Sequence, residues 1–250
     1  MNSKHWDNLA STFEDDITSS LHDDKSKTLF KTLKKYISKK DVIADYGCGV
    51  GGFVPFLSSL GKFVSASDFS PKCVEQAKKK HGKISNAEFF VHDLTKPLSK
   101  KCNVAVAANV LISHQPDLLK KMIKTISSTV KPGGYFVAVV PSMESILFVY
   151  QTLIEVRIDA GDSPKQARNY VAKKMKRDFI SMTDGVVKVG KVPTKHFVGE
   201  EFEALLKRNK LEVVERTKVQ YGWDTEMDHV PKDLKAPYPF DWIFVSKKIR

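Results

Sequence analysis

The sequence predicts an α/β fold in which a mostly parallel, seven-stranded sheet carries helices on both faces. Two observations predict it. Apolar segments of strand length alternate with segments of helical periodicity, and five such strands follow one another between residues 41 and 140, which is typical of strand–helix–strand units. The strand segments also lack a strict alternation of apolar and polar residues, as expected for strands that are buried on both faces.

The same pattern predicts each element in order. The chain begins with two helical stretches over residues 3–38, and the second has one apolar face that includes Leu29, Leu33 and Ile37. Strands are expected at 41–45, 62–68, 87–92, 102–109, 134–140, 211–220 and 240–246. Helices are expected at 53–60, 71–81, 116–130 and 199–209, with Pro71 opening one of them and Gly82 ending it.

The alternation breaks after the fifth strand. Residues 143–180 predict two extra helices, and residues 185–197 predict an irregular or stranded connector. We therefore expect a single domain over residues 1–250, in which 1–38 form an N-terminal helical cap and 143–198 form an inserted lid or substrate-binding segment.

The composition is that of an ordinary soluble globular protein, with 42% apolar and 28% charged residues. The N-terminal residues lack the apolar stretch of a signal peptide, and no apolar run is long enough to cross a bilayer. The three cysteines are widely spaced, which fits neither a disulfide framework nor a zinc site. We expect a cytoplasmic protein that binds no metal ion and does not associate with a membrane.

The formal net charge of +12 raises the question of an anionic partner. Several lysine pairs fall near the predicted ends of helices, where cations interact favourably with the helix dipole. Arginine, the better bidentate partner for phosphate, is scarce beside lysine. The pattern favours a solvated basic surface over nucleic-acid recognition, which stays open as the alternative.

A glycine-rich loop follows the first strand and reads Asp-Tyr-Gly-Cys-Gly-Val-Gly-Gly at residues 45–52. Its glycines let the chain turn sharply and let a ligand approach the backbone, while the next helix offers N–H donors. Gly47, Gly49 and Gly52 also match the dinucleotide fingerprint, and Asp68 lies 21 residues after Gly47. Alone, the loop leaves open a nicotinamide-binding protein or a glycine turn without a ligand.

Four segments in order resemble motifs of the class I S-adenosylmethionine-dependent methyltransferases, of the type that acts on small molecules. They are residues 42–51, 64–70, 92–94 and 109–114. The resemblance covers roughly residues 40–142, and it includes the acidic Asp45, for which a hydride-transferring enzyme has no use. It implies a Rossmann-like sheet whose last strand is antiparallel, with S-adenosyl-L-methionine as the cofactor and S-adenosyl-L-homocysteine as its product.

The resemblance also implies which residues bind the methyl donor. They are Asp45, Gly47, Cys48, Gly49, Asp68, Phe69, Asp93, Leu94 and Asn109. In the family the first acid holds the amino group of the methionine part, and the acid at the end of the second strand accepts from the ribose hydroxyls. The Asp-Leu pair grips adenine, and the Asn position lines the donor near its methyl group.

Structural roles remain open for most of these residues. Asp45 and Asp68 could bond to the backbone of their own loops, and Asp93 could be a plain turn residue. Asn109 could satisfy backbone groups at the end of a buried strand. Cys48 is better suited to packing than to nucleophilic chemistry.

The acceptor should bind beyond the carboxyl ends of the strands, between inserted and terminal segments. The candidates for contact with it are Trp6, Phe13, Tyr150 and His196, and His114 is a candidate catalytic base with an equally good structural role. Trp6 and Phe13 belong to a start that resembles the opening helix of small-molecule methyltransferases, although both could equally be core residues. Further polar or aromatic groups in reach are Tyr221, Trp223, Asp224 and Asp241.

The expected function is transfer of the donor's methyl group to a nitrogen or oxygen of a small molecule by in-line displacement. A lid of the size of residues 143–198 encloses a small acceptor more naturally than a folded macromolecule. The sequence has no Asn/Asp-Pro-Pro-Tyr motif at the end of the fourth strand and no cluster with metal-ligand spacing. An RNA or protein methyltransferase that uses the same donor is the alternative.

Overall fold

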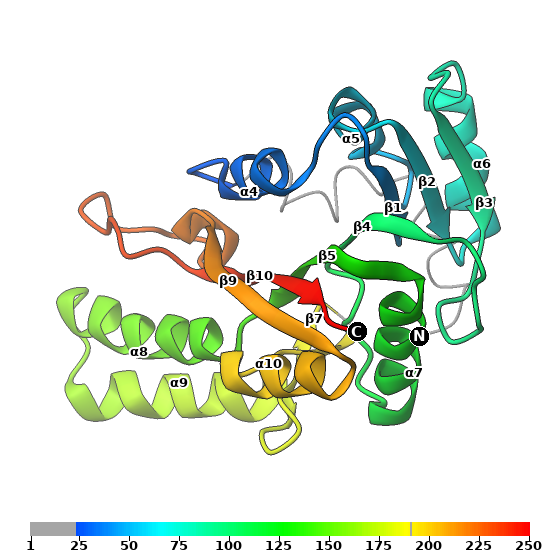
Figure 1. The fold of residues 1–250 in the computed structure, drawn as a ribbon. Coiled ribbons are helices and arrows are strands. Elements are labelled where there is room, and N and C mark those ends of the chain that lie inside the picture. Colours follow the sequence, from blue (N-terminus) through cyan, green and yellow to red (C-terminus); the bar gives the residue numbers. More distant parts are fainter. Residues whose placement is uncertain (1–23, 191) are drawn as a thin grey trace.

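A computed structural model of the chain describes residues 24–190 and 192–250. In this part of the chain the main sheet has seven strands in the order β3-β2-β1-β4-β5-β10-β9 (Figure 1). The strands are β1 Val42–Tyr46, β2 Phe63–Asp68, β3 Ala87–Val91, β4 Cys102–Ala108, β5 Val130–Pro141, β9 Leu211–Gln220 and β10 Phe240–Lys248. β10 is antiparallel to both β5 and β9, while the pairings from β3 to β5 are parallel. The seven-stranded, mostly parallel sheet with a reversed last strand is confirmed.

Helices cover both faces of this sheet. They are α4 Thr28–Tyr36, α5 Val54–Leu60, α6 Pro71–His81, α7 Pro116–Thr129, α8 Met143–Asp159, α9 Pro164–Asp178 and α10 Gly199–Arg208. The apolar sides of α4, α5 and α6 bury one face of the sheet, and those of α7 and α10 bury the other (Figure 1). Along β4, Val104 and Val106 belong to the first layer and Ala105 and Ala107 to the second, because successive side chains of a strand point to opposite faces.

Strand five is longer than the predicted 134–140. Val130 pairs with Cys102, the register then shifts, and pairing resumes with Val104 opposite Tyr135 and continues to Ala108 opposite Val139. This bulge or irregularity places extra residues of β5 within the strand without ending the ladder. A turn of the Lys-Pro-Gly-Gly type therefore lies inside the strand rather than before it.

The segment between β5 and α10 contains the two extra helices that the sequence predicts, α8 and α9, which lie side by side (Figure 1). The connector after them is stranded: β6 Phe179–Ser181, β7 Val186–Val189 and β8 Val192–Lys195 form a small antiparallel sheet. This sheet is tied to the main one, because Lys195 N–H donates to Ile112 O at 3.0 Å and Phe197 N–H donates to Pro141 O at 2.8 Å.

The predicted N-terminal cap is described only in part. Helix α4 buries Leu29 and Leu33 completely, as its apolar face predicts, and Asp24 caps its start by accepting from Leu29 N–H at 3.0 Å. The earlier helical stretch, with Trp6 and Phe13, lies outside the described residues.

Candidate functional site

The glycine loop joins β1 to α5 at the carboxyl edge of the sheet, the edge at which the parallel strands end. Gly47 and Gly49 adopt φ values of +66° and +54°, which favour glycine. Cys48 N–H donates to Ser67 O at 3.0 Å, so the loop is bonded to the end of β2. A Cβ atom at Gly47 would lie 2.4 Å from Cγ2 of Val110, which excludes any side chain at this turn.

Asp68, the last residue of β2, fixes two backbone segments at once. Its Oδ2 accepts from Gly49 N–H at 3.0 Å, and its Oδ1 accepts from Ser70 N–H at 2.8 Å. The side chain of Ser70 then accepts from Cys73 N–H at 3.1 Å and caps α6. The carboxylate thus combines the backbone role left open by the sequence with a position beside the loop.

Asp45, near the end of β1, is 4% exposed. Its Oδ2 is buried and has no hydrogen-bond partner among the described residues. Burial, followed by the negative charge of Asp68, raises the pKa of this carboxyl from 3.8 to about 7. Because an unpaired buried carboxylate is costly, this oxygen is well suited to a cationic ligand group.

Asn109 follows β4 at the same edge and has a φ of +55°, a left-handed conformation that asparagine tolerates better than most residues. Its N–H donates to Val139 O at 3.0 Å. Its side chain hydrogen-bonds to the carboxylate of Asp241, the second residue of β10. The carboxyl edge therefore carries Asp68, Asp45, Asn109 and Asp241 in the order of β2, β1, β4 and β10.

Asp241 is the centre of a hydrogen-bonded group. The sequence analysis gave Asp241 and Tyr221 only as two of several residues in reach of the acceptor. Besides Asn109, Asp241 accepts from Tyr221 Oη at 2.8 Å and from the backbone of Ser142. Its burial nevertheless raises its pKa to about 6. Glu226, which the sequence analysis did not single out, lies close enough for the charge of Asp241 to raise its pKa, and burial contributes more, bringing it to about 7.

Comparison with known proteins identifies the fold and the domain. Residues 43–134 match the family model described as a methyltransferase domain. The match contains the glycine loop and the three acidic motif positions, and the site around them has the geometry given above. Residues 43–134 therefore form a methyltransferase domain, and the chain has the fold of S-adenosylmethionine-dependent methyltransferases.

Several relatives of this methyltransferase are known. A tRNA N(3)-methylcytidine methyltransferase from Schizosaccharomyces pombe is 33% identical over 104 residues, which are 38% of this chain and 42% of that protein. A methyltransferase from Methanosarcina mazei has a similar structure, with a TM-score of 0.63 and 18% identity over 87% of this chain and 97% of the other. So has the N-methyltransferase NodS from Bradyrhizobium japonicum in complex with S-adenosyl-L-homocysteine, with a TM-score of 0.62 and 14% identity over 100% of both chains.

The chain spans less than half the length of the curated relatives that it matches. The structural matches share less than a fifth of their residues with it and establish the fold. For the donor, the unpartnered oxygen of Asp45 fits the family's cofactor, because a buried carboxylate oxygen suits a cationic amino group.

Two of the methyltransferase's predicted donor residues lie after β3. Asp93 is exposed, and its Oδ1 accepts from Thr95 N–H at 2.8 Å, which is the turn role left open by the sequence. Leu94 is 7% exposed and packs with the face of the sheet that α7 covers. Contact of either residue with adenine stays a prediction.

The remaining donor candidates are Phe69 and Cys48. Phe69 is half-buried directly after Asp68. Cys48 is buried within the loop, and this burial raises the pKa of its thiol well above the ordinary value. The thiol is held neutral, which fits a packed residue that lines the loop and not a nucleophile.

The two histidine candidates belong to neighbouring segments. His114 is half-buried, and its Nδ1 is buried without a partner among the described residues. His196 is 5% exposed, and its Nδ1 lies 3.1 Å from Thr194 O. Burial lowers the pKa of His196 to about 4, so its ring is neutral near pH 7. It follows Lys195, which bonds to Ile112 two residues before His114.

Tyr150 connects the two helices of the insertion. Its hydroxyl donates to Asp178 Oδ2 at 2.9 Å, and its ring lies 5.9 Å from that of Phe179. Asp178 also pairs with Lys174 and Arg177 at 2.9 Å. These contacts give Tyr150 a structural role, and its predicted contact with the acceptor remains a prediction.

Among the described residues, no group of three or more His, Cys, Asp or Glu side chains could hold a metal ion. In the same part of the chain, every helix is too short or too polar to span a membrane.

Proposed function

We propose that this methyltransferase transfers the methyl group of S-adenosylmethionine to a nitrogen or oxygen of a small-molecule acceptor. The observation that carries the proposal is the attachment of the insertion to the carboxyl edge. Helix α8 starts directly after β5, and Ser145 Oγ accepts from Phe240 N–H at 2.8 Å, at the first residue of β10. An insertion fixed at this place suits a small enclosed ligand.

The chain's own residues would hold the donor by charge and by position. The cofactor, when bound, supplies a methyl group that is already activated on a sulfonium. The ionised carboxylate of Asp45 would pair with the donor's amino group. Asp68, which two backbone hydrogen bonds orient, would accept from the ribose hydroxyls of the donor. Alignment of this kind supplies about 7–11 kcal/mol of barrier lowering in favourable cases.

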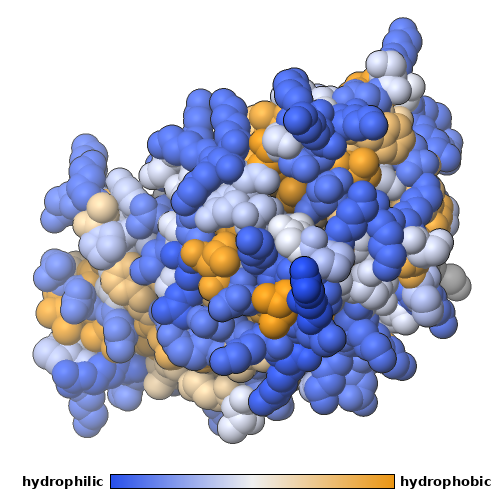
Figure 2. Space-filling model, in the orientation of Figure 1, coloured by the Kyte–Doolittle hydropathy of each residue, from blue (hydrophilic) through white to orange (hydrophobic). Residues whose placement is uncertain are grey.

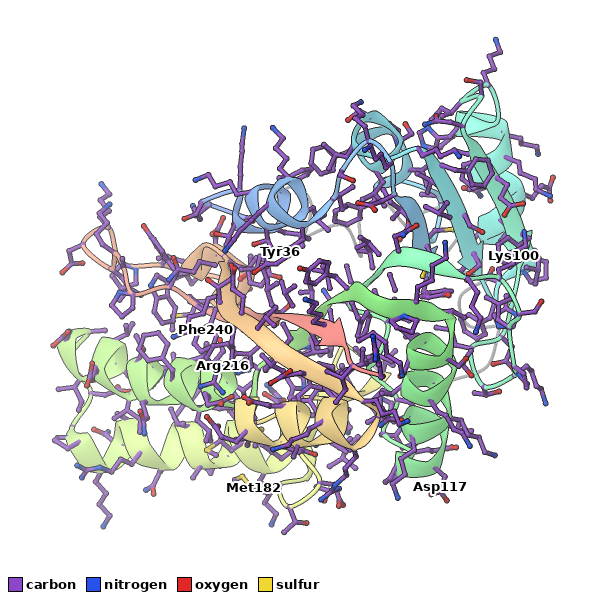
Figure 3. The ribbon with its side chains drawn as sticks, viewed as in Figure 1. Tyr36, Lys100, Asp117, Met182, Arg216 and Phe240 are labelled. Atoms are coloured by element: carbon purple, nitrogen blue, oxygen red, sulfur yellow. The ribbon has the colours of Figure 1, made fainter. Side chains whose placement is uncertain are left out.

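The donor half of this proposal is tested by calorimetry with S-adenosyl-L-homocysteine. We expect micromolar-range binding by the wild type and a loss of about 100-fold in Asp68→Ala, because the loop bonds and the ribose acceptor are removed together. Asp117→Asn is the control, since Asp117 is exposed on α7, far from Phe240 at the carboxyl edge (Figure 3). Absence of binding by the wild type would contradict the proposal.

A second candidate acceptor is RNA. Two observations favour it: the net charge of +12 and the similarity to a tRNA methyltransferase. The face in Figure 2 is mainly hydrophilic, with hydrophobic residues in small separate areas, and a surface of this kind is compatible with either acceptor. The carboxylates of Asp241 and Glu226 at the carboxyl edge weigh against a phosphate backbone there.

A binding titration with tRNA at several salt concentrations distinguishes RNA from a small molecule as the acceptor. RNA as the acceptor predicts affinity that falls steeply as salt rises, whereas the small-molecule proposal predicts weak binding or none at physiological ionic strength. The predicted organisation as one domain and the predicted cytoplasmic location are part of the same proposal, and the second rests on three cysteines that are all free.

A further inference from the structure

The group around Asp241 has no part in the donor site as the motifs define it. Its carboxylate accepts from Tyr221 of the segment after β9, from the Asn109 side chain after β4 and from the Ser142 backbone after β5. Three donors from three different strand ends fix both the position and the direction of this carboxylate. These neutral donors hold the carboxylate in place, while burial raises its pKa to about 6 and so lets it take up a proton more readily than an exposed aspartate.

No lysine or arginine neutralises Asp241 among the residues that the structure describes. Lys174 and Arg177, which belong to α9, pair with Asp178. Glu226, the other carboxyl group near Asp241, adds negative charge; the charge of Lys174 reaches it and lowers its pKa, but less than burial and Asp241 raise it. The negative potential at this point is therefore left for a ligand to balance.

A pair of aromatic residues lies in the same local structure as Glu226. The ring of Phe148 on α8 lies 5.3 Å from that of Trp223, which is 2% exposed. Glu226 N–H donates to Trp223 O at 3.0 Å, so the charged group and the ring pair belong to one local structure. An acid and aromatic residues in one local structure are the side-chain types that bind an organic cation, whose charge pairs with a carboxylate and whose apolar body packs on rings.

Asn109 connects this group to the donor. The family's donor-lining position at the end of β4 is the residue whose side chain bonds to Asp241. A ligand atom held by the Asp241 carboxylate would therefore lie next to the position at which the donor's methyl group is expected. This proximity is what an acceptor-binding residue requires.

We propose that Asp241 binds the methyl acceptor, and that the acceptor is an amine that arrives as an ammonium ion. This inference rests on the proposed function and assigns its substrate class. It favours nitrogen over oxygen, because a hydroxyl group brings no charge to balance the carboxylate.

The transfer balances with Asp241 as the proton acceptor. The ammonium gives one proton to the carboxylate, which frees a lone pair on nitrogen. The new N–C bond forms as the C–S bond breaks, and sulfur keeps the bonding electrons as a neutral thioether. The methylated nitrogen leaves as an ammonium ion, and the proton on Asp241 returns to water.

The experiment compares amines with alcohols of the same shape on protein saturated with S-adenosyl-L-homocysteine. A library of arylalkylamines and alkylamines, each with its alcohol counterpart, is screened by ligand-observed NMR up to millimolar concentration. The variants are Asp241→Asn, which keeps shape and removes charge, Glu226→Gln, and Asp117→Asn as the matched control, whose side chain is exposed on α7.

We expect amines to bind and their alcohols not to bind. Asp241→Asn should weaken amine binding by about tenfold or more, Glu226→Gln by less, and Asp117→Asn not at all. S-adenosyl-L-homocysteine should bind wild type and Asp241→Asn alike within about twofold, which also shows that the variant folds. Amine binding unchanged in Asp241→Asn, equal binding of alcohols, or no amine bound from the library would each overturn the inference. If the wild type did not bind S-adenosyl-L-homocysteine, the proposed function itself would be overturned.

Discussion

Two parts of the carboxyl edge, which we call the donor end at β1 and the acceptor end at β10, hold their carboxylates in opposite ways. At β1, Asp45 is buried with an oxygen that no described residue satisfies. At β10, Asp241 accepts from three donors of the chain itself. The first arrangement is complete only when a cation binds, whereas the second is complete beforehand. The donor end should therefore gain stability from its ligand, and the acceptor end should keep its geometry without one.

The largest effect on the donor end is expected from a substitution in the glycine loop. Gly47→Ala combines a left-handed φ with a Cβ only 2.4 Å from Val110 Cγ2, and rotation of Val110 does not help because its Cγ1 and Cβ lie at 3.1 and 3.3 Å. We expect a loss of about 3 kcal/mol in the free energy of unfolding, measured by urea denaturation. We also expect the variant to lose its binding of S-adenosyl-L-homocysteine.

Gly133→Ala is the matched control for this change. Its φ is +79°, yet nothing lies within 4 Å of the added Cβ, so only backbone strain of about 1 kcal/mol is expected. Equal effects of the two substitutions would show that strain alone, and not the contact with Val110, requires glycine in the loop.

The pH dependence of donor binding sharpens the comparison. The pKa of Asp45 is raised to about 7 in the empty protein, while a cationic amino group prefers the ionised carboxylate. The affinity for S-adenosyl-L-homocysteine should therefore increase by about tenfold between about pH 6 and pH 8. Calorimetry across this range measures it, and Asp45→Asn should bind more weakly at pH 8 with the pH dependence removed.

The stability of the empty protein should change in the opposite direction. A carboxyl group whose folded pKa lies above its unfolded value contributes stability that is fully present below the unfolded pKa and is lost as pH rises through the folded one. For Asp45 this window runs from 3.8 to about 7. Urea unfolding without ligand should show a smaller decline over this window in Asp45→Asn, and an equal decline would assign it to other groups.

The smallest effect is expected in the insertion. Tyr150→Phe removes the hydrogen bond to Asp178 and should cost about 1 kcal/mol in unfolding free energy. Tyr170→Phe is the control, because Tyr170 is 46% exposed and keeps its contact with Arg157 through the ring. Unchanged binding of S-adenosyl-L-homocysteine by Tyr150→Phe would show that the insertion and the donor end are energetically separate. Loss of this binding would contradict that separation.

Local patterns predicted several helices and strands well. The helix over Pro71–His81 and the strand over Leu211–Gln220 have the predicted bounds, because proline, glycine and apolar periodicity act over a few residues. The structure places Asp45 and Asp68 at adjoining strand ends, as expected for neighbouring parallel strands. In contrast, the turn role of Asp93 was one of two alternatives that the sequence left open.

The acceptor end depends on contacts between distant parts of the chain. Asp241 meets Asn109 and Ser142 because β10 inserts antiparallel beside β5, and no local pattern encodes that pairing. Glu226 lies in a loop rich in proline and aspartate, where the sequence does not distinguish it from the other acidic residues. Its burial is the signal, and burial of a loop residue follows only from the packed structure.

The insertion begins and ends at one place. Met143 N–H donates to Phe197 O at 2.9 Å, and Glu144 Oε1 accepts from Gly199 N–H at 2.8 Å. Glu144 Oε2 also accepts from Trp242 Nε1 at 3.0 Å, which anchors both ends to β10. A segment whose two ends touch can be exchanged for another without stretching the chain on either side. Residues 143–198 can therefore be exchanged as one unit while the seven strands, including β10 with Asp241, stay unchanged.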